Sequence, residues 1–187
     1  MWAPDAAHAN GRYYLYFPAR DKAGVFRIGV ATSNSPAGPF KAEPQPMDNA
    51  FSIDPTAYRD DDGIHYLYFG GISGGQLDKW PGNRYSPDTK PLAPDQPAAA
   101  PRVAKLRPDM LGLVEEPREI QILDESGKPL LSGDENRRFF EDAGVYASAS
   151  GFRCAVYFTV TRKRRTPSVI FRTRSSSAGK SGLLVKF

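Results

Sequence analysis

The sequence contains a single cysteine, Cys154, among its 187 residues. One cysteine excludes an internal disulfide framework, so no covalent crosslink is expected to stabilise the fold. No apolar run reaches the ~20 residues that a membrane-spanning helix requires. The first residues also lack the basic and then apolar pattern of a secretory leader. These absences predict no membrane partner and favour the cytoplasm, while the oligomeric state stays open.

Histidine is also scarce, since only His8 and His65 occur. A lone histidine on a strand is more often a surface or cross-strand residue than a metal ligand. The acidic run 60–62 has the composition of a calcium loop, but no glutamate follows at the spacing that such a loop needs. We therefore interpret this run as solvated turn residues, and we predict no metal ligands and no required cofactor for this chain.

Acidic residues are absent from the last part of the chain. Residues 1–142 hold all 21 Asp and Glu and 16 of the 25 Lys and Arg, whereas residues 143–187 hold nine basic residues and no acid. The pI of about 9.2 thus comes from the C-terminal segment and is not a nucleic-acid signature of the whole protein. We predict that residues 147–187 form an atypical, poorly ordered basic tail.

Two interpretations of this tail stay open. Basic clusters such as 162–165 are typical of segments that bind nucleic acid or another anionic surface. The alternative is a sequence that selection never shaped for a fold, as a shifted reading frame would produce. We favour the second interpretation because the acids disappear where the recognisable pattern ends, so no nucleic-acid partner is expected.

Turn-forming and aromatic residues are abundant. The 17 glycines, 17 prolines and 12% aromatic residues favour an all-β fold with many turns. The central unit is residues 51–69, in which Pro55 is predicted to hold Asp54 in an extended conformation at the start of a strand. Asp62-Gly63 then predicts a hairpin turn into an alternating aromatic strand. The unit presents the Asp54 carboxylate at its beginning.

The same unit recurs along the chain. Residues 2–17 repeat it around Asn10-Gly11, and the two aromatic strands lie about fifty residues apart. Residues 24–33 predict a third strand, and a turn-rich link leads to a fourth. Residues 81–101 are expected to form a surface loop, and residues 118–131 a strand pair. A repeat of this length with about four strands is typical of β-propeller blades.

A third copy begins at residues 138–146. In this copy Glu141 precedes the turn glycine by ten residues, against nine for Asp54 in the central unit. Because equivalent strand starts converge on the axis of a radial array, we expect both carboxylates to face one cavity. Residues 1–146 are thus predicted to form about two blades and the start of a third.

Three motifs in this order resemble glycoside hydrolase family 43. They are Trp2-Ala3-Pro4-Asp5 with Gly11–Tyr16, then Ser52-Ile53-Asp54-Pro55 with Asp60–Gly63, then Phe139-Phe140-Glu141. The stretch from Gly74 to Trp80 is similar to a branch with β-xylosidase and α-L-arabinofuranosidase members. The resemblance implies a partial five-bladed β-propeller from an inverting glycosidase of carbohydrate metabolism. Its implied partners are xylo- or arabino-oligosaccharides, as in xylan degradation.

The resemblance also implies roles for the acids. Glu141 corresponds to the general acid, and Asp54 to the residue that tunes the pKa of the general acid and orients it. Inverting hydrolysis also needs a carboxylate base that activates water. The base of the family is an aspartate upstream of the Trp-Ala-Pro-Asp motif, so we expect a fragment from which the base is missing.

Four further residues are implied to bind substrate: Trp2, Asp5, Phe51 and Gln76. Trp2 and Phe51 are either apolar platforms for a sugar ring or core aromatics, and the sequence leaves both interpretations open. The resemblance also admits a calcium ion on the propeller axis of an intact family member. The leading hypothesis is a weakly active or inactive fragment of a glycosidase. The alternative is a non-catalytic carbohydrate-binding or degenerate propeller remnant.

Overall fold

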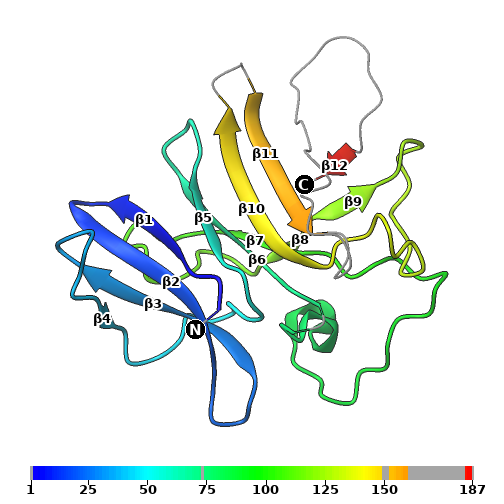
Figure 1. The fold of residues 1–187 in the computed structure, drawn as a ribbon, viewed down its shortest axis with the longest axis horizontal. Coiled ribbons are helices and arrows are strands. Elements are labelled where there is room, and N and C mark those ends of the chain that lie inside the picture. The colour runs from blue at the N-terminus through cyan, green and yellow to red at the C-terminus, as the bar shows by residue number, and fades with distance from the viewer. Residues whose placement is uncertain (1, 73, 149–151, 160–183, 187) are drawn as a thin grey trace.

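The computed structural model describes residues 2–72, 74–148, 152–159 and 184–186, and its regular secondary structure is strands with almost no helix (Figure 1). The strands form two four-stranded antiparallel sheets and two separate strand pairs. The predicted all-β class is confirmed. Within the described residues no helix is long and apolar enough to cross a membrane.

The first sheet is one complete blade of consecutive strands in the order β1-β2-β3-β4. Its members are β1 (Asp5–Ala9), β2 (Arg12–Arg20), β3 (Phe26–Ser33) and β4 (Lys41–Ala42). The turn between β1 and β2 is the predicted one, because Asn10 and Gly11 both have positive φ, at 54° and 69°. Two consecutive residues of this kind are typical of a tight type I′ hairpin turn.

The second sheet has the same order, β5-β6-β7-β8. Its strands are β5 (Thr56–Arg59), β6 (His65–Phe69), β7 (Arg102–Lys105) and β8 (Arg118–Glu119). The sequence did not predict β7, which follows a long connection. The described residues of this connection include two short 3-10 turns, η1 (Leu77–Lys79) and η2 (Pro81–Asn83). Strand β7 has only four residues and follows a proline-rich loop, so its alternating pattern is too short to be recognised in the sequence.

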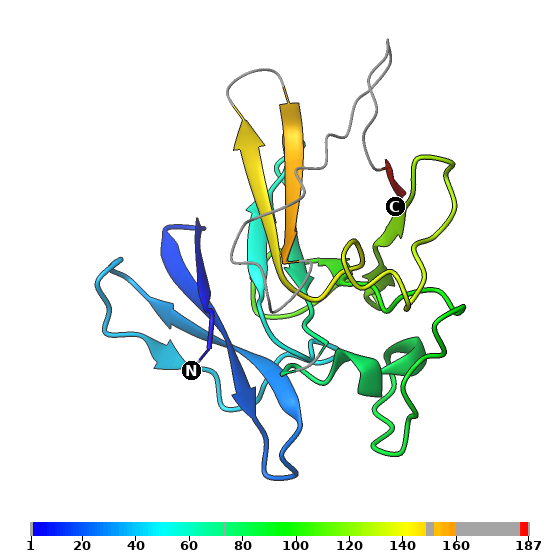
Figure 2. The same ribbon diagram turned by 45° about the vertical axis from the view of Figure 1, so that its right-hand side comes forward.

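The third repeat begins with the hairpin of β10 (Glu141–Ser148) and β11 (Phe152–Thr159). Strand β10 lies against β5 and β6, as two views of the ribbon show (Figures 1 and 2). A separate pair joins β9 (Gln121–Leu123) to β12 (Leu184–Lys186). The predicted boundary at residue 146 falls inside β10. Residues 160–183 of the predicted tail lie outside the described residues.

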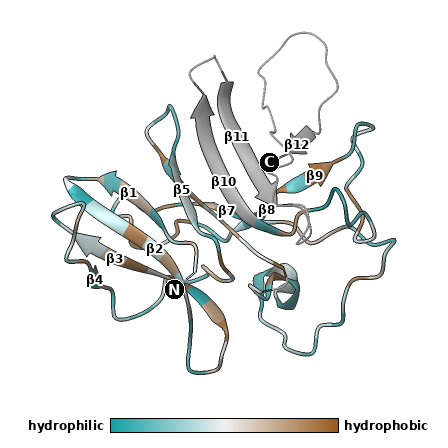
Figure 3. Ribbon diagram, viewed as in Figure 1, coloured by the Kyte–Doolittle hydropathy of each residue, from teal (hydrophilic) through white to brown (hydrophobic). Residues whose placement is uncertain are grey.

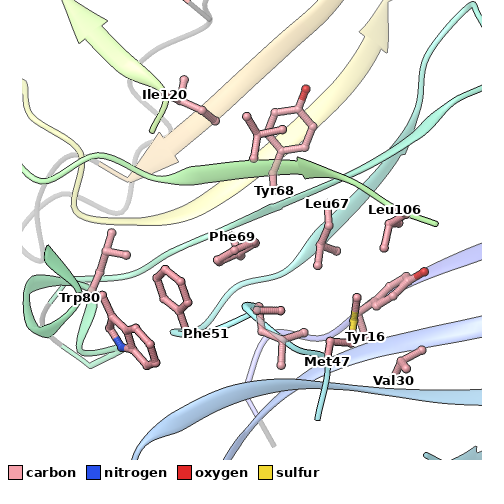
Figure 4. Close-up of a cluster of buried hydrophobic side chains, with 14 of the residues drawn as sticks. Tyr16, Val30, Met47, Phe51, Leu67, Tyr68, Phe69, Trp80, Leu106 and Ile120 are labelled. Atoms are coloured by element: carbon pink, nitrogen blue, oxygen red, sulfur yellow. The ribbon is translucent and has the colours of Figure 1, made fainter. Parts of the chain in front are cut away.

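The core lies between the first and second sheets. In Figure 4, Tyr16, Val30 and Met47 from the first sheet and its following loop face Leu67 and Leu106 from the second. Figure 3 shows that the hydrophobic segments of β2 and β3 are those nearer the centre of the molecule. Burial of such aliphatic and aromatic side chains is the main force that holds two sheets together.

Phe51 occupies the centre of this core. It is fully buried, and its ring stacks on Trp80 with centroids 4.1 Å apart and meets Phe69 edge-on at 5.3 Å. The loop that carries it runs along the edge of β3, where Arg27 and Phe51 form a β-bridge. Phe51 therefore packs both sheets against the connection that follows β6.

We expect Phe51→Ala to lower the free energy of unfolding by about 3–5 kcal/mol, because it leaves a cavity under two aromatic rings. Urea unfolding followed by fluorescence measures the change. Val114→Ala is the control, since Val114 is 60% exposed and should cost less than about 0.5 kcal/mol. A loss below about 1 kcal/mol for Phe51→Ala would contradict the central position of this ring.

One turn type closes three hairpins or loops in the described part of the chain. In each, an Asp N–H donates to the carbonyl four residues later, and a Gly N–H donates back to the Asp carbonyl: Asp21 with Gly24, Asp60 with Gly63, and Asp124 with Gly127. The glycines have φ of 78°, 82° and 79°. This is the three-residue loop with a glycine bulge, one step longer than the two-residue Asp62-Gly63 turn predicted from the sequence.

Two of the carboxylates that cap these turns, Asp21 and Asp124, couple stability to pH. The Val25 N–H lowers the pKa of Asp21, and the Lys128 N–H lowers the pKa of Asp124, because each hydrogen bond favours the ionised form. A depressed folded-state pKa stabilises the fold above the unfolded value of 3.8, and this contribution is lost as pH falls through the folded value.

We therefore expect the thermal midpoint to fall between about pH 5 and about pH 2, and to fall less in the double variant Asp21→Asn with Asp124→Asn. Asparagine retains the turn geometry but does not titrate. Differential scanning calorimetry across this range is the measurement. Equal slopes for the wild type and the double variant would show that these two carboxylates do not contribute.

Candidate active site

Asp54 lies at the end of a constrained turn just before β5. Its φ is +55°, so the predicted extended conformation is wrong. Proline excludes the right-handed helical region for the preceding residue, but aspartate also tolerates the left-handed region that this turn adopts. Ser52 has φ of +69°, so two non-glycine residues near Pro55 are in this uncommon region. Backbone strain of this kind is concentrated at functional sites.

The carboxylate of Asp54 is buried, with 8% of the residue exposed. Its Oδ2 lies 3.5 Å from the position that a Cβ would take on Gly71. Ser52, which has no exposed surface, donates from Oγ to the Gly71 carbonyl and accepts from the Gly71 N–H, at 3.2 and 3.0 Å. The connection after β6 therefore forms one wall of the space around Asp54.

Glu141 reaches the same connection from the other side. It is the first residue of β10 and is half-buried. The Ile72 N–H donates to the carbonyl of Phe140 at 2.8 Å, and the Gly70 N–H donates to the carbonyl of Ile53 at 2.8 Å. The three residues 70–72 thus bond to the residue before each of the two acids. The structure brings the two strand starts together, and a cavity shared by both carboxylates stays a prediction.

Trp2 lies beside this connection and is half-exposed, at 50%. Its ring packs on Phe26 at 5.3 Å and covers Gly74, where a Cβ would lie 2.7 Å from the ring. The absence of a side chain at position 74 is what lets the ring approach the backbone. An indole supported on one side and exposed on another is suited to stack on a sugar, so this interpretation of Trp2 stays a prediction.

Phe51 is not available for this purpose. The sequence left open whether it is a sugar platform or a core aromatic, and its complete burial between Trp80 and Phe69 supports the core interpretation. The platform interpretation of Phe51 is wrong because the loop before Asp54 runs along β3 and turns the ring inward. Sequence alone could not show this direction, since the loop has no regular period.

The other two residues predicted to bind substrate join the sheets. Asp5 accepts a hydrogen bond at Oδ2 from the Ala57 N–H at 2.9 Å, which links β1 to β5. Gln76 accepts from the Phe26 N–H at 3.0 Å and donates to the Gly24 carbonyl at 3.2 Å. Their side chains therefore hold the first sheet to the second, and contact with a substrate stays a prediction.

Arg102 was missed by the sequence analysis, although it is only 3% exposed. Its guanidinium pairs with Glu119 at 2.9 Å, and its Nε donates to Asn83 Oδ1 at 2.8 Å. It also donates to the Trp80 carbonyl at 3.3 Å and to the Ala100 carbonyl. Burial lowers the pKa of Arg102, and Glu119 opposes that shift. This cation fixes the connection that carries Trp80, the partner of Phe51.

Metal ligands are not clustered in the part of the chain with described residues. No group of three or more His, Cys, Asp or Glu there could hold an ion. The side chains of 60–62 belong to the hairpin turn, where Asp60 accepts from the Asp61 N–H and Asp62 from the Ile64 N–H. These carboxylates serve the turn, and no chemical step is assigned to a metal.

Two consecutive antiparallel blades, followed by a hairpin whose first strand begins with an acid, agree with the class of β-propeller glycoside hydrolases. The sequence profile described as Glycosyl hydrolases family 43 matches residues 1–121. The chain belongs to this family. The matched range includes Asp54 and ends before Glu141.

The curated relatives agree with the profile. The chain is 51% identical over 153 residues to xylosidase/arabinosidase 43A of Humicola insolens, covering 78% of this chain and 47% of that protein. It is 47% identical over 146 residues to a xylosidase/arabinosidase of Bacteroides ovatus, covering 78% and 45%. The chain thus spans about half the length of the curated relatives that it matches.

Solved structures confirm the partial propeller. A GH43_1 enzyme from Xanthomonas citri superposes with a TM-score of 0.82 at 51% identity, covering 86% of this chain and 49% of that chain. A GH43 β-xylosidase/α-arabinofuranosidase from a compost metagenome, solved in a calcium-free form with xylotriose, gives a TM-score of 0.80 at 50% identity, covering 85% and 49%.

The position of Gln76 leads to a stability prediction. We expect Gln76→Ala to lower the free energy of unfolding by about 1–3 kcal/mol, because it leaves the Phe26 N–H and the Gly24 carbonyl without their partner. Chemical denaturation is the measurement. Gln96→Ala is the matched control, since Gln96 is exposed. Equal stability of the two variants would show that Gln76 does not join the sheets.

Proposed function

We propose that this chain is the part of an inverting glycoside hydrolase that carries the general acid and the residue that modulates it. The observation that supports this proposal most directly is the backbone segment 70–72, which bonds to both Ile53 and Phe140 and so holds Asp54 and Glu141 at adjoining strand starts. Two acids in one site, with different environments, are what glycosidic hydrolysis requires.

In this proposal Glu141 donates a proton to the glycosidic oxygen as the bond to the leaving group breaks. Asp54 is buried. In this proposal it lies near Glu141, where its negative charge favours the protonated form of the acid. Water then attacks the opposite face of the sugar, activated by a base about 6.5–9.5 Å from the acid. The residues assigned here supply the acid and its modulator and do not include that base.

The proposed substrates are xylose- and arabinose-containing oligosaccharides. Support comes from the relatives, which are a xylosidase/arabinosidase of Humicola insolens and one of Bacteroides ovatus. The Xanthomonas enzyme has been solved in complex with xylose and with xylotriose. In this chain the exposed ring of Trp2 is the aromatic surface on which a pentose would stack. Calcium on the propeller axis is proposed only for an intact protein.

A second candidate is a carbohydrate-binding or degenerate propeller remnant without turnover. The observation that favours it is length, because the chain covers only 47% and 45% of its first two curated relatives. A binding remnant would keep the platform of Trp2 and the fold of the two blades but would not depend on the acids. The two candidates therefore differ in what the substitution of Glu141 does.

We expect the 187-residue chain to hydrolyse aryl β-xyloside and α-arabinofuranoside at least about 10²-fold more slowly than an ordinary glycosidase, because general base catalysis contributes about 10²–10⁴-fold. Any turnover should be abolished by Glu141→Gln for substrates with poor leaving groups. Release of the aryl group and xylotriose binding by calorimetry are measured together. Xylotriose binding with no turnover would favour the remnant. Turnover of a substrate with a poor leaving group that survives Glu141→Gln would contradict the proposed acid.

A further inference from the structure

Ser52 makes a contact that a loop serine does not ordinarily make. Its hydroxyl is fully buried and bonds to both polar backbone groups of one residue, donating to the Gly71 carbonyl at 3.2 Å and accepting from the Gly71 N–H at 3.0 Å. The two residues are 19 positions apart in sequence. The hydroxyl thus ties the turn before β5 to the connection after β6.

The turn at residues 52–54 has an uncommon backbone conformation, which needs contacts from other parts of the chain to persist. Ser52 and Asp54 both have positive φ, at 69° and 55°, and Ile53 between them is 1% exposed. Non-glycine residues persist in this region only when surrounding contacts determine their conformation. The two side-chain hydrogen bonds of Ser52 are among those contacts, as are the Ser52 N–H bond to the Phe26 carbonyl and the Gly70 N–H bond to the Ile53 carbonyl.

The packing around the hydroxyl leaves no free space. A Cβ on Gly71 would lie 2.5 Å from Ile53 Cγ1, and a Cβ on Gly75 would lie 2.7 Å from Ser52 Oγ. Glycine at these positions is what lets the two backbones approach within hydrogen-bond distance. The connection after β6 therefore helps to fix the turn that carries Asp54.

The same connection also bonds to the residue before Glu141. Ile72, next to Gly71, donates its N–H to the Phe140 carbonyl at 2.8 Å. We propose that Ser52 is a positioning residue, whose hydroxyl fixes the Asp54 carboxylate relative to Glu141 through Gly71. This inference rests on the proposed function, because the distance between Asp54 and Glu141 matters only if the two acids act together in catalysis. Ser52 itself need not touch a substrate.

The test measures the electrostatic interaction of the two acids in the 187-residue chain. The titration midpoint of Glu141 is followed by the ¹³C shift of its side-chain carboxyl, which is assigned by its loss in Glu141→Gln. Asp54→Asn removes the neighbouring charge and should lower that midpoint. Ser52→Gly, which suits a positive φ but lacks the hydroxyl, should reproduce at least half of the same displacement, as should Ser52→Ala.

Ser33→Ala is the matched control. Ser33 is also buried and accepts a backbone N–H at Oγ, from Ser35 at 3.1 Å, but it lies on β3 in the first sheet. Its variant should leave the midpoint of Glu141 at the wild-type value. If Ser52 has only a structural role, its variants should lower the thermal midpoint as Ser33→Ala does and should leave the titration midpoint of Glu141 unchanged.

The outcomes separate the two proposals. If Asp54→Asn changes the titration midpoint of Glu141 and the Ser52 variants do not, the positioning role is overturned and the proposed function stands. If Asp54→Asn leaves Glu141 unmoved, the proposed function fails, and the positioning role fails with it. If neither Ser52 variant keeps a folded amide spectrum, Ser52→Cys is measured instead, since a thiol fills a similar space but is only a weak hydrogen-bond donor and acceptor. An unmoved Glu141 in that variant overturns the inference.

Discussion

The hydrogen bonds on either side of residues 70–72 are the contact on which the candidate site depends. They join the segment to Ile53 on one side and to Phe140 on the other. Gly70 has φ of 144°, and a Cβ there would lie 3.3 Å from the Pro101 backbone. Because Gly70 and Gly71 have no side chains, segment 70–72 can approach the two other chain segments closely. Asp54 and Glu141 are the residues that directly follow the two carbonyl groups to which this segment bonds.

Much of the fold could be predicted from the sequence because its signals are local. Asn10-Gly11 and the alternating aromatic strands determine the first hairpin through turn chemistry and side-chain period alone. The repeat at about fifty residues indicated two blades, and the order of both sheets agrees with it. Asp54 and Glu141 were found by their equivalent places in successive repeats, a relation that single-residue properties would not reveal.

The features that the sequence could not predict depend on contacts between distant segments. The turn that carries Asp54 is held by the bonds of Ser52 to Gly71, and the inward direction of Phe51 follows from the bonds of its loop to the edge of β3. Arg102 looks like an ordinary charged residue until its partners are assembled from Asn83, Trp80 and Glu119. A pairwise contact between segments leaves no period in either of them, so pattern analysis has nothing to detect.

The three Asp-x-x-Gly turns bear on how this polypeptide acquires its structure. Each closes its loop with bonds among five neighbouring residues, so it can form without any other part of the chain. Hairpins of this size form in about 1–10 μs, far faster than a ribosome adds a residue. The β5-β6 hairpin can therefore be complete during synthesis while β7 is still unmade, and docking of Phe51 then becomes the later, non-local event.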